Sequence, residues 1–93
     1  MFVNICGIPH EVKVVDVVDP KEQGMVLGEI DHEIPCIRLK SGMSKELTKE
    51  TLIHEIIHGI LVHLGYTKLS NDEQFVQALS NGIYHGFEIK EVE

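Results

Sequence analysis

A chain of 93 residues is long enough for one small domain, and we expect residues 1–93 to form a single unit. Its 15 acidic and 8 basic residues give a formal net charge of -7, which disfavours binding to nucleic acid and to anionic membranes. The sequence contains no apolar run near the roughly 20 residues of a membrane span and no secretory leader, so we expect a cytoplasmic protein.

β-branched residues dominate the beginning of the chain. Val3 and Ile5 are followed by a valine-rich run from Val12 to Val18. Because β-branched side chains favour extended backbone, this segment predicts one or two strands. The sequence Cys6-Gly7-Ile8-Pro9 favours a turn that interrupts them.

A second strand region follows a cluster of turn-forming residues at 19–24. Side-chain patterns predict a strand over residues 25–29 and another over residues 34–39, with a hairpin connection at residues 30–33. We therefore expect antiparallel strands and hairpins throughout the N-terminal half.

A long helix is predicted over residues 44–64. Ser44 is a suitable N-cap, and Glu46 places a negative charge in the first turn, where the helix dipole favours it. Gly65 suits the left-handed position that follows a helix. On a helical wheel, one apolar arc faces the core and contains Ile53, Ile57, Ile60, Leu61 and Leu64.

A second helix is predicted from Ser70 or Asn71 to about Tyr84, and we expect Gly86 to end it. Its expected buried stripe contains Phe75, Val76, Leu79 and Ile83. Residues 87–93 alternate apolar and charged side chains, which fits either an edge strand or a frayed end. Strands followed by two helices indicate an α+β domain.

The long predicted helix contains the HExxH sequence His54-Glu55-Ile56-Ile57-His58. Residues four apart lie on one helix face, so the imidazoles of His54 and His58 can bind the same Zn²⁺. Glu55, about 100° further round the helix, lies too far to bind the metal with both histidines. It is near enough to accept a proton from water, and the motif therefore predicts a zinc hydrolase with Glu55 as general base.

A catalytic zinc site normally has three protein ligands, so a third is needed. His63 misses the third histidine position of the metzincin motif by one residue, and we expect it to face solvent. Glu73 is the preferred third ligand, with Asp72 as the second choice. Alternatively, Ser70 and Glu73 form a capping box in which Glu73 only satisfies a backbone N–H.

The HExxH segment at residues 51–58, followed by residues 72–79, resembles the zincin core of the ImmA/IrrE-type metallopeptidases. In that family a downstream helix opens with a ligand glutamate in the pattern E-x-x-A-N-x-F-A. Glu73 occupies the glutamate position, and the other four are occupied by Val76, Gln77, Leu79 and Ser80. The resemblance covers about residues 24 to 84 and implies a minimal, intracellular zincin of bacterial or phage origin.

These patterns together predict a zinc metalloendopeptidase that acts on a peptide or protein substrate. We expect the substrate to pair with an exposed strand edge at residues 35–39, and Tyr84 and His85 are candidates for stabilising the oxyanion. The alternative is a non-catalytic binding module on a zincin scaffold, whose Zn²⁺ only stabilises the fold.

The remaining histidines and cysteines are expected to be structural or solvated. His10 and His32 lie in turn-like contexts and are expected in solvent. Cys6 and Cys36 are expected to be reduced and buried, although a strand pairing could bring either one to a metal.

Overall fold

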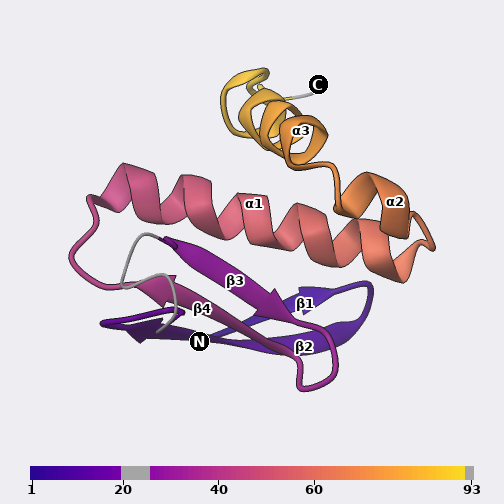
Figure 1. Cartoon of the computed structure of the whole chain (residues 1–93). Coiled ribbons are helices and arrows are strands. Elements are labelled where there is room, and N and C mark those ends of the chain that lie inside the picture. Colours follow the sequence, from indigo (N-terminus) through magenta and orange to yellow (C-terminus); the bar gives the residue numbers. More distant parts are fainter. Residues whose placement is uncertain (20–25, 92–93) are drawn as a thin grey trace.

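The computed structural model describes residues 1–19 and 26–91, which form a four-stranded sheet and three helices (Figure 1). In chain order the elements are β1 (Phe2–Ile5), β2 (Ile8–Val15), β3 (Gly28–Asp31), β4 (Cys36–Lys40), α1 (Lys45–His63), α2 (Thr67–Ser70) and α3 (Glu73–His85). The expected α+β class is confirmed. The turn predicted at residues 19–24 lies, except for Asp19, outside the described residues.

The four described strands form one mixed sheet in the order β1-β2-β4-β3. β1 pairs antiparallel with β2, and β3 pairs antiparallel with β4. The central strands β2 and β4 pair in parallel, from Glu11 opposite Cys36 to Val15 opposite Lys40. Antiparallel pairing is therefore confirmed for both hairpins and wrong for the centre. After β2 the chain continues to β3 at the far edge, so β4 returns beside β2 in the same direction.

The turn between β1 and β2 consists of Cys6 and Gly7, so the predicted turn is confirmed for these two residues, whereas Ile8 and Pro9 already belong to β2. Cys6 and Gly7 both have positive φ, 51° and 81°, which the type I′ turn of a two-residue hairpin requires. The turn places Cys6 in solvent, while Cys36 on β4 is half-buried and both thiols are free. The expectation of a buried thiol is wrong for Cys6, because a two-residue turn projects beyond the sheet.

The hairpin between β3 and β4 starts two residues later than predicted. The Asp31 carboxylate accepts hydrogen bonds from the backbone N–H groups of Glu33 (2.9 Å) and Ile34 (3.1 Å). An aspartate that bonds the backbone two residues on nucleates a turn after its own position. The side chain of Asp31 therefore ends β3, and β4 begins only after Pro35.

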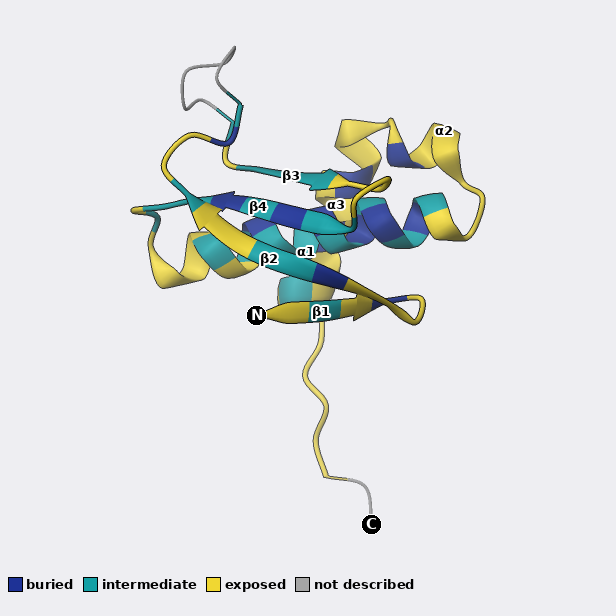
Figure 2. Cartoon of the chain, turned by 90° about the horizontal axis from the view of Figure 1, so that it is seen from below, coloured by how far each residue is buried: buried dark blue, intermediate teal, exposed yellow. Residues whose placement is uncertain are grey.

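One face of the sheet packs on α1 and the other faces outward (Figures 1 and 2). Apolar side chains on the inner face of the sheet pack against an apolar side of α1. The sheet contributes Ile5, Ile37 and Leu39, and the helix contributes Leu52, Ile56 and Ile60. On the outer face, Arg38 forms an ion pair with Glu29, directly opposite it on β3. A sheet with one buried face explains the alternation that predicted its strands.

Both ends of α1 match the prediction. Ser44 Oγ accepts a hydrogen bond from Leu47 N at 3.1 Å and caps the N-terminus. At the other end, Gly65 has a φ of 86°, its N–H donates to Val62 O, and Tyr66 N donates to Leu61 O. These two bonds form a Schellman motif, which satisfies carbonyls that the helix leaves unpaired.

α1 lies between the sheet and α3, and it is apolar on two sides. The second apolar side packs Ile57 and Leu61 against Val76 of α3. The arc predicted from the helical wheel is confirmed for the four residues that belong to this cluster or pack against it, Ile53, Ile57, Ile60 and Leu61. The prediction missed the other apolar side of α1, where Leu52 and Ile56 pack against the sheet. Leu64, which was assigned to that arc, follows the last helical residue and is 60% exposed.

The second predicted helix is divided into α2 and α3. Thr67–Ser70 forms one short turn, and α3 begins only at Glu73, with Asp72 as its N-cap. On α3, Val76 and Ser80 are buried, whereas Phe75, Leu79 and Ile83 remain exposed. The predicted stripe is wrong for these three residues, because α3 packs on α1 and α2 and not on the described strands.

Gly86 ends α3, as predicted. Residues 87–91, the described part of the C-terminal segment, form neither helix nor strand and lead away from the domain (Figure 2). Within the part of the chain that the structure describes, no helix has the length and apolar character needed to cross a membrane.

Candidate metal centre

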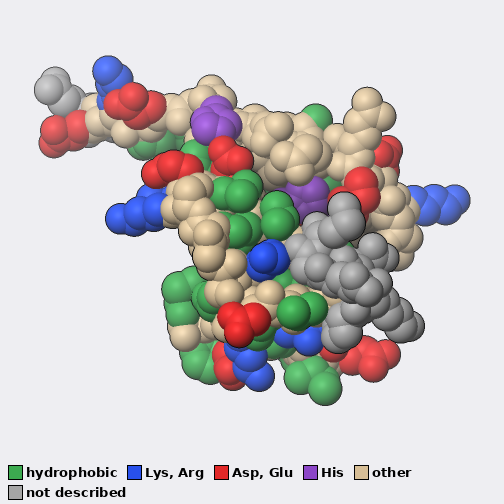
Figure 3. Space-filling model, turned by 60° about the vertical axis from the view of Figure 1, so that its left-hand side comes forward, with side chains coloured by type: hydrophobic (Ala, Val, Ile, Leu, Met, Phe, Trp, Pro, Cys, Tyr) green, Lys and Arg blue, Asp and Glu red, His purple; other side chains and the backbone are tan. Residues whose placement is uncertain are grey.

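The two histidines of the HExxH motif face a pocket of about 610 Å³ between β3, α1 and the α2–α3 segment. Glu73, the first residue of α3, lies on the opposite wall from these histidines. The lining residues include Glu29, Glu50, Glu55 and Glu73 and, among the described residues, no lysine or arginine. The Glu29 carboxylate is paired with Arg38. Figure 3 shows one face of the molecule, on which acidic side chains lie close beside histidines.

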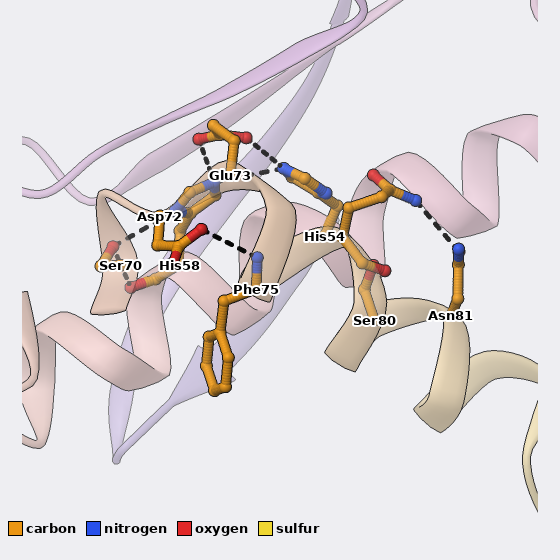
Figure 4. A network of polar contacts seen from close by, with 9 residues as sticks. His54, His58, Ser70, Asp72, Glu73, Phe75, Ser80 and Asn81 are labelled. Carbon is orange, nitrogen blue, oxygen red and sulfur yellow. Dashed lines mark hydrogen bonds and ion pairs between the residues drawn. The ribbon is translucent and has the colours of Figure 1, made fainter. Parts of the chain in front are cut away.

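His54, His58 and Glu73 bring three candidate ligand atoms together (Figure 4). The two Nε2 atoms are 3.2 Å apart. Glu73 Oε2 is 3.1 Å from His54 Nε2, and Glu73 Oε1 is 3.0 Å from His58 Nε2. Ligand atoms on a tetrahedral Zn²⁺ are about 3.3 Å apart, so the separations described here are close to those that the ion requires.

Ser70 determines which nitrogen of His58 faces the pocket. Its Oγ donates to the His58 carbonyl oxygen at 3.3 Å and lies 3.2 Å from His58 Nδ1. Because the hydroxyl donates its proton to the carbonyl, the ring Nδ1–H must be the donor to Oγ. The neutral ring then has an unprotonated Nε2. A metal-binding histidine is held in the same way by a group behind the ring.

The contact between His58 and Glu73 therefore joins two acceptors. His58 Nε2 and Glu73 Oε1 lie 3.0 Å apart, which requires a proton or a cation between them. Burial lowers the pKa of His58, and although the negative charge of Glu73 opposes this effect, the net direction is down. The neutral imidazole with an unprotonated Nε2 is favoured, and a cation between Nε2 and the carboxylate would satisfy both atoms.

Glu55 lies beside this group but does not belong to it. It is 7% exposed, lines the pocket, and is not among the three residues whose ligand atoms converge. Burial first, and the negative charge of Glu73 second, raise the pKa of Glu55 from 4.5 to about 7. A carboxyl group with this pKa can exchange a proton with water near neutral pH.

Asp72, the second choice for the third ligand, has a different role. Its carboxylate accepts a hydrogen bond from Phe75 N at 3.0 Å and caps α3 (Figure 4). Because Asp72 is the N-cap, Ser70 cannot be, and the capping box of Ser70 and Glu73 is wrong. Ser70 instead lies buried in α2, next to His58.

Tyr84 and His85 are not brought to the pocket. The Tyr84 hydroxyl donates to Glu46 Oε2 at 2.6 Å, and His85 Nε2 lies 3.2 Å from Glu50 Oε1. Neither residue lines the pocket. Both lie at the C-terminal end of α3, whereas Glu73 is its first residue, so α3 places them away from the histidines.

The strand edge beside the pocket is β3. Residues 35–39, predicted as the edge, largely coincide with β4, which pairs with β2 on one side and β3 on the other. That prediction is wrong, because the parallel pairing places β4 inside the sheet. β3 pairs only with β4 among the described strands, and Gly28, Glu29 and Ile30 line the pocket.

Sequence reasoning missed three polar residues near the centre, and one of its histidine assignments is wrong. Ser70 and His32 line the pocket, and Thr51 lines it from α1. No metal-site motif marks any of them, and Ser70 was considered only as part of a capping box. His10, expected in solvent, is fully buried because it lies on the inner face of β2, whereas His32 and His63 are exposed, as expected.

Comparisons with known proteins give no match to this chain among family models, curated proteins or solved structures. The resemblance to the ImmA/IrrE-type metallopeptidases therefore rests on the residues quoted above and stays a prediction.

Proposed function

We propose that this chain is a zinc-dependent peptidase whose metal is held by His54, His58 and Glu73. The observation that carries the proposal is the convergence of three side chains, in which the two histidine Nε2 atoms are 3.2 Å apart and each lies 3.0 to 3.1 Å from one of the two Glu73 carboxylate oxygens. A chance pair of surface histidines has no reason to meet a carboxylate from another helix with zinc-like spacing. A buried glutamate next to this group adds the residue that hydrolysis requires.

Each protein group has a distinct task in this proposal. Zn²⁺ at the three ligands supplies a Lewis acid, which polarises a peptide carbonyl and lowers the pKa of water to about 7. Glu55 accepts a proton from the attacking water and then gives it to the leaving amine. The substrate lies extended along β3, where backbone pairing at a strand edge orients the scissile bond.

The second candidate is a binding module in which the metal is structural. The supporting observation is that Glu73 belongs to α3, whereas both histidines belong to α1. A metal bound to all three residues joins two helices whose contact contains few buried side chains, and this stabilises the fold without any chemistry. This candidate predicts metal binding and no hydrolysis.

The test compares wild type with Glu55→Gln, using metal analysis and hydrolysis of an unfolded protein and a mixed peptide library. We expect about one Zn²⁺ per chain in both proteins, because glutamine at position 55 removes no ligand. Hydrolysis should fall at least about 100-fold in Glu55→Gln, as expected when a general base is lost. Glu46→Gln is the matched control, because it makes the same change on α1 outside the pocket.

The outcomes separate the two candidates. If no zinc binds to purified wild type at micromolar concentration, both are wrong. If zinc binds but wild type and Glu55→Gln are equally inactive, the peptidase is excluded and the binding module remains. If hydrolysis persists in Glu55→Gln, a contaminant or another residue is responsible, and the role assigned to Glu55 is rejected.

A further inference from the structure

Three histidines outside the candidate metal centre gather near the C-terminal end of α1. His10 comes from β2, His32 follows β3 in the hairpin connection, and His63 is the last residue of α1. The rings of His10 and His63 have centroids 6.0 Å apart and are nearly perpendicular, at 88°. The peptidase proposal leaves the contact between His10 and His63 unused, and His32 lines the main pocket.

His10 is the unusual member of this group. Its Nδ1 is 2.8 Å from the carbonyl oxygen of Ile8, and a carbonyl accepts only, so Nδ1 carries the proton. In the neutral ring Nε2 then has a lone pair. This Nε2 is buried and has no hydrogen-bond partner in the described structure, and the whole residue is 0% exposed.

An imidazole whose Nδ1–H donates to a carbonyl and whose Nε2 has a free lone pair can bind a metal ion. Metal-binding histidines typically donate one N–H to a backbone carbonyl and direct the other, unprotonated nitrogen at the ion. His10 has both features. A buried acceptor without a donor destabilises the fold, and a cation at Nε2 is one way to relieve that cost.

The spacing of His10 and His63 fits a shared ion after a small movement. Two imidazoles on one tetrahedral Zn²⁺ have centroids about 5 Å apart. His54 and His58 have a centroid distance of 4.9 Å, and the 6.0 Å between His10 and His63 is about 1 Å longer. His63 is exposed at the end of its helix, so a change of side-chain torsion can close this difference.

His32 supplies the third imidazole. Partial burial lowers the pKa of His32, and the neighbouring charges of His63 and His10 lower it further, in that order. The electrostatic influence of His63 and His10 on this pKa supports a position of His32 in the same part of the molecule. It is exposed, lies in a hairpin connection and also lines the main pocket, so its side chain can turn toward His10.

We propose that His10, His32 and His63 form a second site for a late first-row transition-metal ion such as Zn²⁺ or Ni²⁺. Neutral imidazoles suit these ions, whereas Mg²⁺ and Ca²⁺ prefer oxygen ligands. The site is weaker than the first, because only His54, His58 and Glu73 among the described residues already have ligand atoms within 4.8 Å of one another. The proposal does not depend on peptidase activity.

The test is calorimetric titration of the metal-free chain with Zn²⁺ and, separately, Ni²⁺. We expect two sites in wild type. Replacing either exposed ligand, in His63→Ala or His32→Ala, should weaken the second site at least about 10-fold, since even groups behind a ligand have effects of that size. His54→Ala should impair the first site and keep the second. His85→Ala is the control, because this exposed histidine lies elsewhere, next to Glu50.

Nuclear magnetic resonance of the ring nitrogens tests His10 without substituting a buried residue. Saturation of the second site should shift the His10 Nε2 resonance and leave that of His85 unchanged. The proposal is overturned if wild type binds one ion at saturation, or if the second site survives in His63→Ala. It is also overturned if the His10 Nε2 signal does not move, which would show that this nitrogen does not bind the ion.

Discussion

Ser70 Oγ lies 3.2 Å from His58 Nδ1 and 3.3 Å from the carbonyl oxygen of the same residue. One buried hydroxyl therefore holds both the ring and the backbone of a metal-ligand candidate. The hydrogen bond to the ring selects the form whose Nε2 faces Glu73. The chemistry of the pocket thus depends on a residue that does not face the metal position itself.

Removing this hydroxyl should weaken metal binding. We expect Ser70→Ala to lower Zn²⁺ affinity about 10- to 100-fold, because the His58 ring loses its orienting partner. Competition with a chromophoric chelator measures the effect. Ser80→Ala is the matched control, since Ser80 is equally buried but bonds only to Gln77 O. Equal affinities in the two variants would show that Ser70 does not orient His58.

Substitution of Glu73 and of Asp72, the two adjacent acidic residues at the start of α3, should affect different properties of the protein. Glu73→Ala removes a proposed ligand, so zinc binding should fall sharply while the cap of α3 remains. Asp72→Ala removes the hydrogen bond to Phe75 N, and the metal-free protein should lose about 1 kcal/mol of stability while its ligands remain. Chelator competition and urea unfolding measure both quantities. Retention of wild-type affinity in Glu73→Ala would eliminate Glu73 as a ligand.

The raised pKa of Glu55 predicts how the stability of the metal-free protein varies with pH. Folding shifts this pKa upward, from 4.5 to about 7, so the folded state holds a proton that the unfolded state has already released. The resulting stabilisation is complete below pH 4.5 and is lost as the pH rises to about 7. Relative to Glu55→Gln, wild type should lose about 3 kcal/mol over this range.

Urea unfolding in the presence of a chelator, at half-unit pH intervals, measures this difference. The comparison with Glu55→Gln cancels the titration of the histidines, which both proteins share. Glu46→Gln makes the same change outside the pocket and should leave the pH-dependent loss of stability assigned to Glu55 in place. Parallel stability curves for wild type and Glu55→Gln would mean that Glu55 titrates normally.

Close packing of α1 on the pocket edge depends on Gly28. A Cβ at this position would lie 2.7 Å from Thr51 Cγ2, and Thr51 is held by a hydrogen bond from Oγ1 to Leu47 O. We expect Gly28→Ala to destabilise the protein by about 1 to 3 kcal/mol through overpacking. In a Thr51→Ser background, which removes that methyl group and keeps the hydroxyl, the penalty should be smaller. A double-mutant cycle by urea unfolding measures this coupling, and an unchanged penalty would refute it.

Local signals explain what could be predicted from the sequence. The ends of α1 depend on Ser44 and Gly65, whose effects act within a few residues. The two histidines converge because a helix repeats every 3.6 residues, whatever surrounds it. The second helix was predicted to start at Ser70 or Asn71, whereas α3 starts at Glu73 because Asp72 is its N-cap.

Long-range relations explain what could not be predicted. Short strands have the same side-chain alternation in parallel and antiparallel pairs, so the pattern of β4 did not reveal that it lies between β2 and β3. For the same reason, the sequence did not reveal that His10 is buried. The role of Ser70 depends on a contact across 12 residues between two helices, and no spacing rule describes such a contact.

The parallel pairing of β2 and β4 has a consequence for the order in which the molecule folds. Each hairpin joins strands that are close in sequence and can form within microseconds, as can the helices. Val15 and Lys40, which are paired at the end of β2 and β4, are 25 residues apart, so their pairing closes a much longer loop. Docking one hairpin onto the other is therefore the expected slow step of folding, and the helices that carry His54 and Glu73 can form before the sheet is complete.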